Sequence, residues 1–256
     1  MKKFAFNITL KKILFALPWI HRARKLWSMS RKYKRTPEMV SLNERYSYLL
    51  KLSKKIIKMH NVNYVIKGLD NLPNNGGVLL TPNHKSNIDA LLIIAALEKQ
   101  TEALGDSHKF PTFVAKKELE KKRVLKHALK LLDTVSIDRA NFRESLAKVL
   151  EFGEYLKKEK RYGVIFPEGT RVQGDDLGEF KAGAFKTAQK NYLNIIPVAI
   201  INSEQALNSK RRGRIKVIVS FLKPIKASTI IGQDAKALGE KVRKSIIDEI
   251  KKYDKE

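Results

Sequence analysis

From about residue 62 onward, short apolar runs alternate with longer stretches in which apolar positions recur every three or four residues. Runs rich in Val, Ile and aromatic residues, bounded by Gly, Pro or Asn, predict β-strands, whereas the longer spacing predicts helices. The alternation indicates an α/β domain with a mixed, largely parallel sheet flanked by helices. The strand-like runs are NYVIKG, GVLLTP, FPTFVA, TVSI, GVIFP, NIIPVAI and RIKVIVSFL, and the helical stretches are 88 to 99, 117 to 132, 141 to 160, 181 to 191 and 234 to 253.

The first 61 residues follow another pattern and predict an N-terminal amphipathic helical pair. In the first helix the apolar positions are Leu10, Ile13, Leu14 and Leu17. The second helix is expected after Ser41, because Ser41 and Glu44 form a capping-box pattern ahead of an apolar face. We therefore expect two parts, residues 1–61 as basic amphipathic membrane-associating helices and residues 62–256 as the α/β domain.

The basic charge is concentrated in this front segment. Residues 1 to 60 contain 16 Lys and Arg against only Glu38 and Glu44, which is more than half of the net charge of +26. Such an excess predicts a polyanionic partner: nucleic acid, an anionic membrane surface or a phosphorylated substrate. The absence of cysteine excludes disulfides and thiol nucleophiles and is typical of a reducing compartment.

The front segment does not have the pattern of a membrane-spanning helix or of a cleaved signal peptide. No apolar run approaches the roughly 18 residues that a spanning helix needs, Pro18 interrupts the longest, and no small-residue cleavage site follows. A basic helix with one apolar face suits a membrane interface. We expect peripheral or monotopic attachment to the cytoplasmic face of the cell membrane. The alternative, in which the helical pair packs on the domain with a solvated basic face, stays open.

The stretch TPNHKSNIDALL, residues 81 to 92, carries the first candidate chemistry. His84 follows an apolar strand, and Asp89 stands five residues later at the start of a helix. An imidazole there can act as a general base, with a carboxylate accepting its other ring N–H. Residues five apart do not share a face of a regular helix, so contact requires a turn at His84. The alternative is structural: Asn87 as helix cap and Asp89 as a favourable charge in the first turn.

Other chemistries are less favoured by the sequence. Ser86 lacks the flanking glycines of a nucleophile elbow, so a covalent serine mechanism is not expected. The remaining four histidines share no metal-ligand spacing and are expected to be solvated, so no metal site is expected. These four are His21, His60, His108 and His127.

Cationic residues follow three other strands. In GVIFPEGTR, Gly169 lets the backbone approach a ligand, Thr170 offers a hydroxyl, and Arg171 offers a planar pair of donors for phosphate oxygens. Arg139 follows TVSI, and Lys116 follows FPTFVA. Together they predict a site that holds a phosphorylated substrate beside a general base.

These motifs resemble the glycerolipid acyltransferase family, specifically the 1-acylglycerol-3-phosphate acyltransferases. The N-H-x-S-x-x-D block is present in residues 83–89, the F-P-E-G-T-R block in residues 166–171 and the apolar I-P-V-A-I block within IIPVAI, residues 195–200. FVAKKEL is similar to the family's lysine-bearing strand end, and the resemblance covers residues 65 to 200. One position departs: the family usually has a glycine six residues before Arg139, and this chain has Asp133.

The resemblance implies transfer of a fatty acyl group from acyl-CoA or acyl carrier protein to the sn-2 hydroxyl of 1-acylglycerol 3-phosphate, giving phosphatidic acid in phospholipid biosynthesis. It implies His84 as the catalytic base and Asp89 as its orienting partner. It also implies phosphate-binding and pocket-shaping roles, with Glu168 as a positioning residue, for Lys116, Arg139, Glu168, Gly169, Thr170 and Arg171. No cofactor and no metal are implied, and the partners are a lysophospholipid, an anionic membrane surface and, as one possible donor, acyl carrier protein.

Several alternatives remain. The acceptor could be another lysophospholipid or glycerol 3-phosphate. A non-catalytic lipid-binding relative would keep the fold, although the intact His84 and Asp89 argue against it. A basic nucleic-acid-binding protein would suit the charge, but the sequence has no zinc finger, helix-turn-helix or aromatic RNA-binding pattern, so no nucleic acid is expected.

Overall fold

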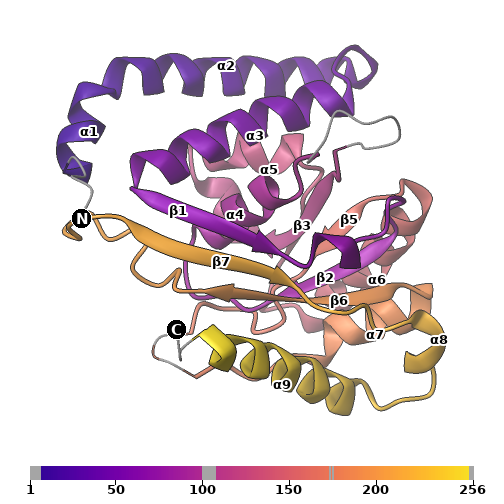
Figure 1. Cartoon of the computed structure of the whole chain (residues 1–256). Helices are drawn as coiled ribbons and strands as arrows, with labels where there is room; N and C mark the ends of the chain where they lie inside the picture. The colour runs from indigo at the N-terminus through magenta and orange to yellow at the C-terminus, as the bar shows by residue number, and fades with distance from the viewer. Residues whose placement is uncertain (1–6, 100–107, 173, 175, 254–256) are drawn as a thin grey trace.

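The structure is a computed structural model that describes residues 7–99, 108–172, 174 and 176–253 of the 256-residue chain. At its centre is a seven-stranded sheet with the order β1-β7-β6-β2-β5-β3-β4 (Figure 1). All neighbouring strands are parallel except β6 and β7, which confirms the mixed, largely parallel sheet. The strands are β1 Val62–Lys67, β2 Val78–Pro82, β3 Pro111–Lys116, β4 Val135–Ile137, β5 Tyr162–Val164, β6 Asn194–Ile201 and β7 Ile215–Phe221.

Helices cover both faces of this sheet. Helices α3, α4 and α5 pack on one face and α6, α7 and α9 on the other, while α2 lies outside α3 (Figure 1). The helices are α1 Ile8–Leu14, α2 Ala16–Arg35, α3 Leu42–Met59, α4 Asp89–Ala96, α5 Leu125–Leu131, α6 Phe142–Lys158, α7 Ala182–Asn191, α8 Ala227–Ile230 and α9 Ala235–Tyr253. Short 3₁₀ turns, including Lys117–Lys121, connect some of them.

The central strands are apolar throughout because both of their faces are buried. In β2, Val78 and Leu80 pack toward α3 and α4, whereas Leu79 packs toward α6 and α7. All three side chains are at most 2% exposed. A parallel strand covered on both faces has no solvent side, so it has no reason to alternate with polar residues. This is why the runs GVLLTP and NIIPVAI read as unbroken apolar segments.

The N-terminal helices are present, and residues 7–59 form three of them where two were expected. The first predicted helix is divided at Phe15 into α1 and α2. Pro18 has no backbone N–H and cannot donate to a carbonyl of α1, but it is tolerated in the first turn of a new helix. The predicted cap of α3 is confirmed, because the Glu44 N–H donates to Ser41 Oγ at 3.2 Å. The predicted helix at 117 to 132 is also divided, into the turn Lys117–Lys121 and α5. The boundary at residue 62 stays a prediction.

Asp133 lies in the turn between α5 and β4, where the related family usually has glycine. Its φ is +51°, in the left-handed region that non-glycine residues avoid at a cost of about 1–2 kcal/mol. Asp is among the few residues that visit this region, since its short polar side chain can bond locally. Its carbonyl accepts a hydrogen bond from Thr112 Oγ1 at 2.9 Å. The chain therefore keeps a left-handed turn here without glycine.

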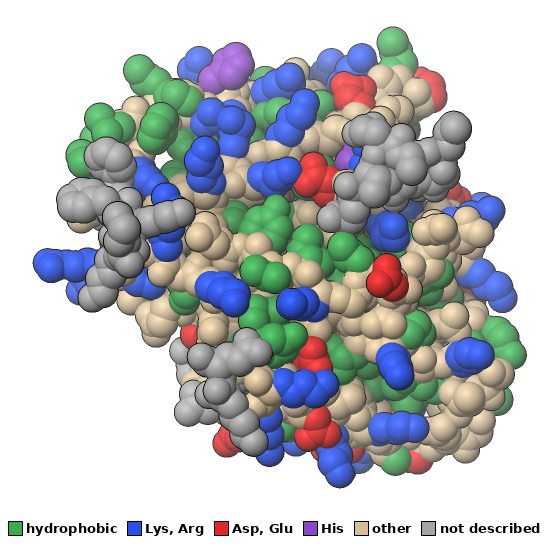
Figure 2. Space-filling model, in the orientation of Figure 1, with side chains coloured by type: hydrophobic (Ala, Val, Ile, Leu, Met, Phe, Trp, Pro, Cys, Tyr) green, Lys and Arg blue, Asp and Glu red, His purple; other side chains and the backbone are tan. Residues whose placement is uncertain are grey.

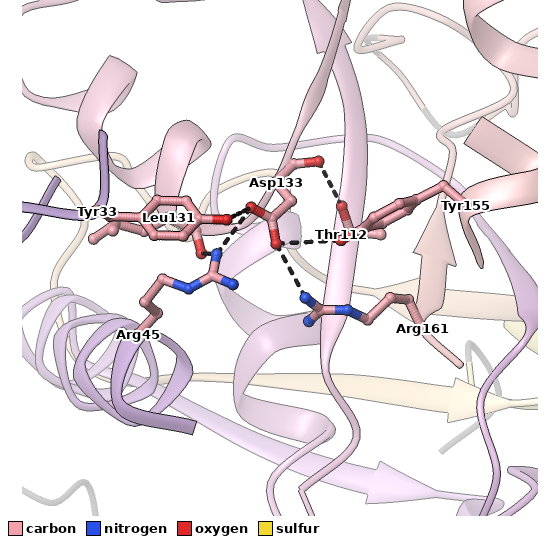
Figure 3. Close-up of polar contacts among 7 residues, drawn as sticks. All are labelled: Tyr33, Arg45, Thr112, Leu131, Asp133, Tyr155 and Arg161. Carbon is pink, nitrogen blue, oxygen red and sulfur yellow. Dashed lines mark hydrogen bonds and ion pairs between the residues drawn. The ribbon is translucent and has the colours of Figure 1, made fainter. Parts of the chain in front are cut away.

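The Asp133 carboxylate binds the side chains of Tyr33, Arg45, Tyr155 and Arg161, and we call these five residues together the Asp133 cluster (Figure 3). Oδ1 accepts from Tyr33 Oη at 2.6 Å and Arg45 Nη1 at 2.9 Å. Oδ2 accepts from Arg161 Nη2 at 3.0 Å and Tyr155 Oη at 3.2 Å. Burial, then the nearby carboxylate, raises the pKa of Tyr155 to about 12, so this phenol stays a donor at neutral pH. The cluster joins α2 and α3 to α6 and to Arg161, the residue before β5.

Asp133→Ala is expected to lower the free energy of unfolding by about 3–5 kcal/mol. It leaves Arg45 and Arg161, each 6% exposed at the side chain, without their carboxylate. Asp133→Gly is expected to be about 1–2 kcal/mol less harmful than Asp133→Ala, since glycine has no left-handed penalty. Urea unfolding measures both variants.

The matched control for this prediction is Glu154→Ala. Glu154 lies 3.7 Å from Lys190 in a pair whose side chains are both more than half exposed. Its removal should change the unfolding free energy by less than about 0.5 kcal/mol. An Asp133→Ala protein as stable as this control would contradict a stabilising role for the cluster.

Candidate active site

Four neighbouring parallel strands end at the same edge of the sheet. Strands β2, β5, β3 and β4 lie side by side in that order. Their carboxyl ends lead into His84, the 166–171 loop, Lys116 and Arg139, respectively. In open α/β sheets, ligands bind beyond the carboxyl ends of the strands. The fold therefore brings the predicted site segments to one edge.

Asn83 fixes the end of β2. It is 1% exposed, its Nδ2 donates to the Ile200 carbonyl at 2.9 Å, and its Oδ1 accepts from the Ile200 N–H at 2.7 Å. A side-chain amide that makes both bonds to one residue satisfies the strand backbone where β2 leaves the sheet. The residue before His84 is thus pinned to β6.

The predicted contact between His84 and Asp89 is present. Asp89 is the first residue of α4 and is fully buried, and its Oδ2 lies 2.9 Å from His84 Nδ1. The same oxygen accepts the backbone N–H groups of Lys85 at 2.9 Å and Ser86 at 2.8 Å. The five-residue spacing is closed because the chain turns back on this carboxylate before the helix starts.

Of the structural alternative, the Asn87 cap is wrong, whereas Asp89 does stand in the first turn of α4. Ile88, with no side-chain cap bond, occupies the N-cap of α4, and Asn87 is exposed. Asp89 also closes the turn and contacts the imidazole with one oxygen. One carboxylate therefore holds both the turn and the imidazole.

The His84 ring is held with one nitrogen toward the carboxylate. Its side chain is 19% exposed, and the Phe166 ring packs against it with 4.1 Å between centroids. A carboxylate accepts hydrogen bonds, so Nδ1 carries the proton and the Nε2 lone pair is left to act as a base. This is the arrangement that general-base catalysis requires.

Glu168 positions the backbone of His84. It is 3% exposed, and its Oε1 accepts the His84 N–H at 2.6 Å while its Oε2 accepts the Gly178 N–H at 2.8 Å. The His84 carbonyl accepts the Val172 N–H at 3.2 Å. The loop after β5 is therefore hydrogen-bonded to the turn after β2. The Asp89 carboxylate holds the ring of His84, and the Glu168 carboxylate holds its backbone.

Lys85 is a buried cation that the sequence analysis did not single out. It is 5% exposed, and its Nζ donates to the carbonyls of Gly174, at 2.7 Å, and Asp176. It ties the segment beyond the 166–171 loop to the residue that follows His84. The sequence gives no signal for it, since both acceptors are backbone carbonyls far along the chain.

Two cationic side chains converge on Gly169. Its φ is +68°, and a Cβ built on it would lie 3.4 Å from Arg139 Nη2 and 3.5 Å from Lys181 Nζ. Partial burial lowers the pKa of Arg139, while the Glu118 carboxylate opposes this shift. Lys116 is half-buried at the end of β3, in register with Ile137, two residues before Arg139. Arg139 was predicted here; Lys181 was not.

Thr170 and Arg171 are exposed beyond Gly169. Within the described ranges neither has a side-chain hydrogen bond or ion pair with another residue. The structure puts them in the correct loop, and their roles in binding stay predictions.

The expectation for the other histidines is wrong for His60. It is 6% exposed, and burial lowers its pKa. Its ring nitrogen contacts the Ile56 carbonyl, and the Arg211 side chain, far along the chain, donates to its backbone carbonyl, which its sequence surroundings did not reveal. His127 contacts Ser30 Oγ at 3.1 Å and His108 packs edge-on against Tyr46, so neither is fully solvated. Among the described residues, no three His, Cys, Asp or Glu gather as a metal-binding group.

Comparison with known proteins identifies the class of this fold and site. The acyltransferase family model matches residues 63–201, and the chain therefore belongs to the acyltransferase family. It is an O-acyltransferase, the activity in the names of its curated relatives.

The individual relatives are more specific. A probable 1-acyl-sn-glycerol-3-phosphate acyltransferase of Mycoplasma pneumoniae is 36% identical over 183 residues, covering 72% of this chain and 66% of that protein. The corresponding Mycoplasma genitalium protein is 35% identical, covering 76% of each. The crystal structure of the 1-acyl-sn-glycerophosphate acyltransferase PlsC from Thermotoga maritima has the same fold, with a TM-score of 0.72, 21% identity and 95% coverage of both chains.

Glu168→Gln is expected to lower kcat by about 10- to 100-fold. Glutamine has the shape of glutamate, but an NH₂ group replaces one of the two carboxylate oxygens that accept backbone N–H groups. A charge-assisted bond of about 1.5–3 kcal/mol is therefore lost. The His84 turn is then less well held. Steady-state acyl transfer measures the effect, and circular dichroism monitors folding.

Glu179→Gln is the control for Glu168→Gln. Glu179 is exposed and adjoins Gly178, and it makes no side-chain bond within the described ranges. Its kcat should equal that of the unchanged protein. Equal kcat values for both variants would exclude a positioning role for Glu168.

Proposed function

We propose that this enzyme transfers a fatty acyl group from acyl-CoA or acyl carrier protein to the sn-2 hydroxyl of 1-acylglycerol 3-phosphate. The product is phosphatidic acid, a precursor in phospholipid biosynthesis. The observation that carries the proposal is the 2.9 Å contact between His84 Nδ1 and the buried Asp89 carboxylate, at a strand end flanked by cations. The names of the relatives support the same acceptor.

His84 acts as the general base in the proposed reaction. Its Nε2 takes the proton of the acceptor hydroxyl as the oxygen attacks the thioester carbonyl, and Asp89 stabilises the imidazolium that forms. The tetrahedral intermediate collapses with cleavage of the C–S bond. The leaving thiolate takes the proton from His84, which returns the base to its starting state, and no covalent enzyme intermediate forms.

Cations hold the acceptor in the proposed complex. Lys116, Arg139 and Arg171 bind the phosphate group, and Gly169 and Thr170 shape the surface against which it lies. A phosphate held at the ends of β3, β4 and β5 keeps the glycerol hydroxyl beside β2 and His84. Such orientation of two substrates contributes up to about 7–11 kcal/mol of barrier reduction.

An acceptor and donor panel tests the proposal directly. Purified protein is given labelled acyl-CoA or acyl carrier protein against 1-acylglycerol 3-phosphate, other lysophospholipids and glycerol 3-phosphate. We expect 1-acylglycerol 3-phosphate to have the highest kcat/KM. A higher value for glycerol 3-phosphate or for another lysophospholipid would replace the proposed acceptor with that compound.

His84→Ala is expected to lower kcat by about 10²- to 10⁴-fold, the usual contribution of a general base. Asn87→Ala, an exposed change in the same turn, should leave kcat unchanged. Initial rates with saturating substrates measure both. If His84→Ala retains the rate of Asn87→Ala, His84 is not the base.

We further propose that α1 and α2 hold the enzyme on the anionic, cytoplasmic face of the cell membrane as a peripheral or monotopic protein. No helix in the described part of the chain is long and apolar enough to cross a bilayer. Hydrophobic side chains gather over α1 and the start of α2, beside Lys and Arg (Figure 2). The large exposed apolar residues of this surface are Leu10, Ile13, Leu14, Phe15, Leu17, Ile20 and Trp27.

Two arginines of α2 lie over the rings of its two tryptophans. The Arg22 guanidinium lies 4.8 Å from the Trp19 ring centroid and that of Arg31 lies 4.7 Å from the Trp27 ring centroid. Aromatic and basic residues together suit the head-group region, where each cation near an anionic leaflet contributes about 1 kcal/mol. An enzyme placed there would meet its lipid acceptor without moving the acyl chain through water.

The double substitution Leu14→Asp, Leu17→Asp is expected to weaken binding to anionic vesicles by about 100-fold or more. The two side chains are 64% and 78% exposed, and each buried leucine contributes about 1.5–3 kcal/mol. Sedimentation with phosphatidylglycerol vesicles measures binding. The control is Ile231→Asp, at an exposed apolar position after α8. If both variants weaken vesicle binding by the same small amount, α1 and α2 do not contact the membrane.

A further inference from the structure

We propose that Lys181, at the start of α7, is an additional residue that binds the acceptor phosphate. This inference rests on the proposed function and adds a residue that the family motifs in the sequence do not indicate. Those motifs gave cations only at the ends of β3, β4 and β5. Lys181 comes from a different part of the fold, the N-terminal end of α7, which packs on the same face of the sheet as α6 and α9.

The geometry places Lys181 near Arg139. Both side chains approach the open face of Gly169, with Lys181 Nζ 3.5 Å and Arg139 Nη2 3.4 Å from the position of a Cβ. The two cationic nitrogens are therefore no farther apart than the sum of these distances, about 7 Å. Charge-assisted bonds to phosphate oxygens are about 2.7–2.9 Å long, so one phosphate group can accept from both.

Neither cation is paired with a carboxylate of the protein in the described ranges, although Glu118 is near enough to act on the pKa of Arg139. The first turn of α7 contains no acidic residue. Both residues are exposed, and like charges at this distance repel each other. An anionic ligand that bridges them would offset this repulsion.

The base of Lys181 is held by the protein. Its backbone N–H donates to the Pro167 carbonyl at 2.9 Å, which ties the start of α7 to the 166–171 loop. The preceding Phe180 is 1% exposed in the core. The lysine is therefore carried by a fixed backbone beside Gly169, and only its side chain has to be ordered on binding.

The test compares an acceptor that has a phosphate with one that lacks it. Lys181→Ala should raise KM for 1-acylglycerol 3-phosphate by about 10- to 100-fold, the effect of losing one charge-assisted bond. Its kcat should change little, and its kcat/KM for 1-monoacylglycerol should equal that of the unchanged protein. Lys181→Arg, which keeps the charge, should restore most of the affinity. Lys186→Ala, an exposed lysine on the same helix, is the matched control.

Two outcomes would overturn the assignment. One is an unchanged KM for 1-acylglycerol 3-phosphate in Lys181→Ala, and the other is an equal loss with 1-monoacylglycerol, which would indicate a structural effect. Failure of the proposed function itself would appear differently, as no transfer by the unchanged protein to any acceptor. In that case glycerol 3-phosphate binding by equilibrium dialysis still tests Lys181: weaker binding in Lys181→Ala supports the phosphate contact, and equal binding rejects it.

Discussion

The buried Asp89 carboxylate is the interaction on which the active-site turn depends. A charge removed from water must be met by donors, and one Asp89 oxygen accepts three: the His84 ring and the backbone N–H groups of Lys85 and Ser86. These bonds hold the chain in a turn between β2 and α4, so the contact between His84 and Asp89 is part of the local fold. Glu168 adds a second buried acceptor on the backbone side of His84. The position of the imidazole is therefore set by two carboxylates rather than by a free loop.

The charged groups around His84 and Gly169 fall into two sets. In the first set, the carboxylates of Asp89 and Glu168 accept hydrogen bonds from His84. In the second set, Arg139 and Lys181 approach Gly169 and form no ion pair in the described ranges. The first set orients the imidazole, and the second suits the phosphate of the proposed acceptor. Lys85 uses its charge differently, since it bonds backbone carbonyls and holds the loop in place. Lys85 and the cations around Gly169 therefore have different surroundings within one site. The net charge of the chain does not distinguish them.

The sequence predicted the features that local pattern determines. Apolar runs gave the strands, helical spacing gave most helices, and the strand-end positions of His84, Lys116 and Arg139 placed them at one edge. Contacts between distant segments were missed, because no spacing rule links Lys181 to Gly169 or Lys85 to Gly174. His60 was misjudged for the same reason: its basic sequence neighbours say nothing of the elements that cover it. Pro18 did signal a break, but the pattern around it read as a single helix.

Asp133 also constrains how this chain can vary. A glycine at this position would fit the left-handed backbone but would leave Arg45 and Arg161 buried beside each other without their shared carboxylate. Neutral replacements of the arginines would in turn leave the carboxylate without its counter-charges. The three positions are therefore expected to be epistatic, and exchange of the aspartate for glycine costs least stability when both arginines change as well. Covariation of these three sites across close relatives would be the evolutionary record of a buried charge balance.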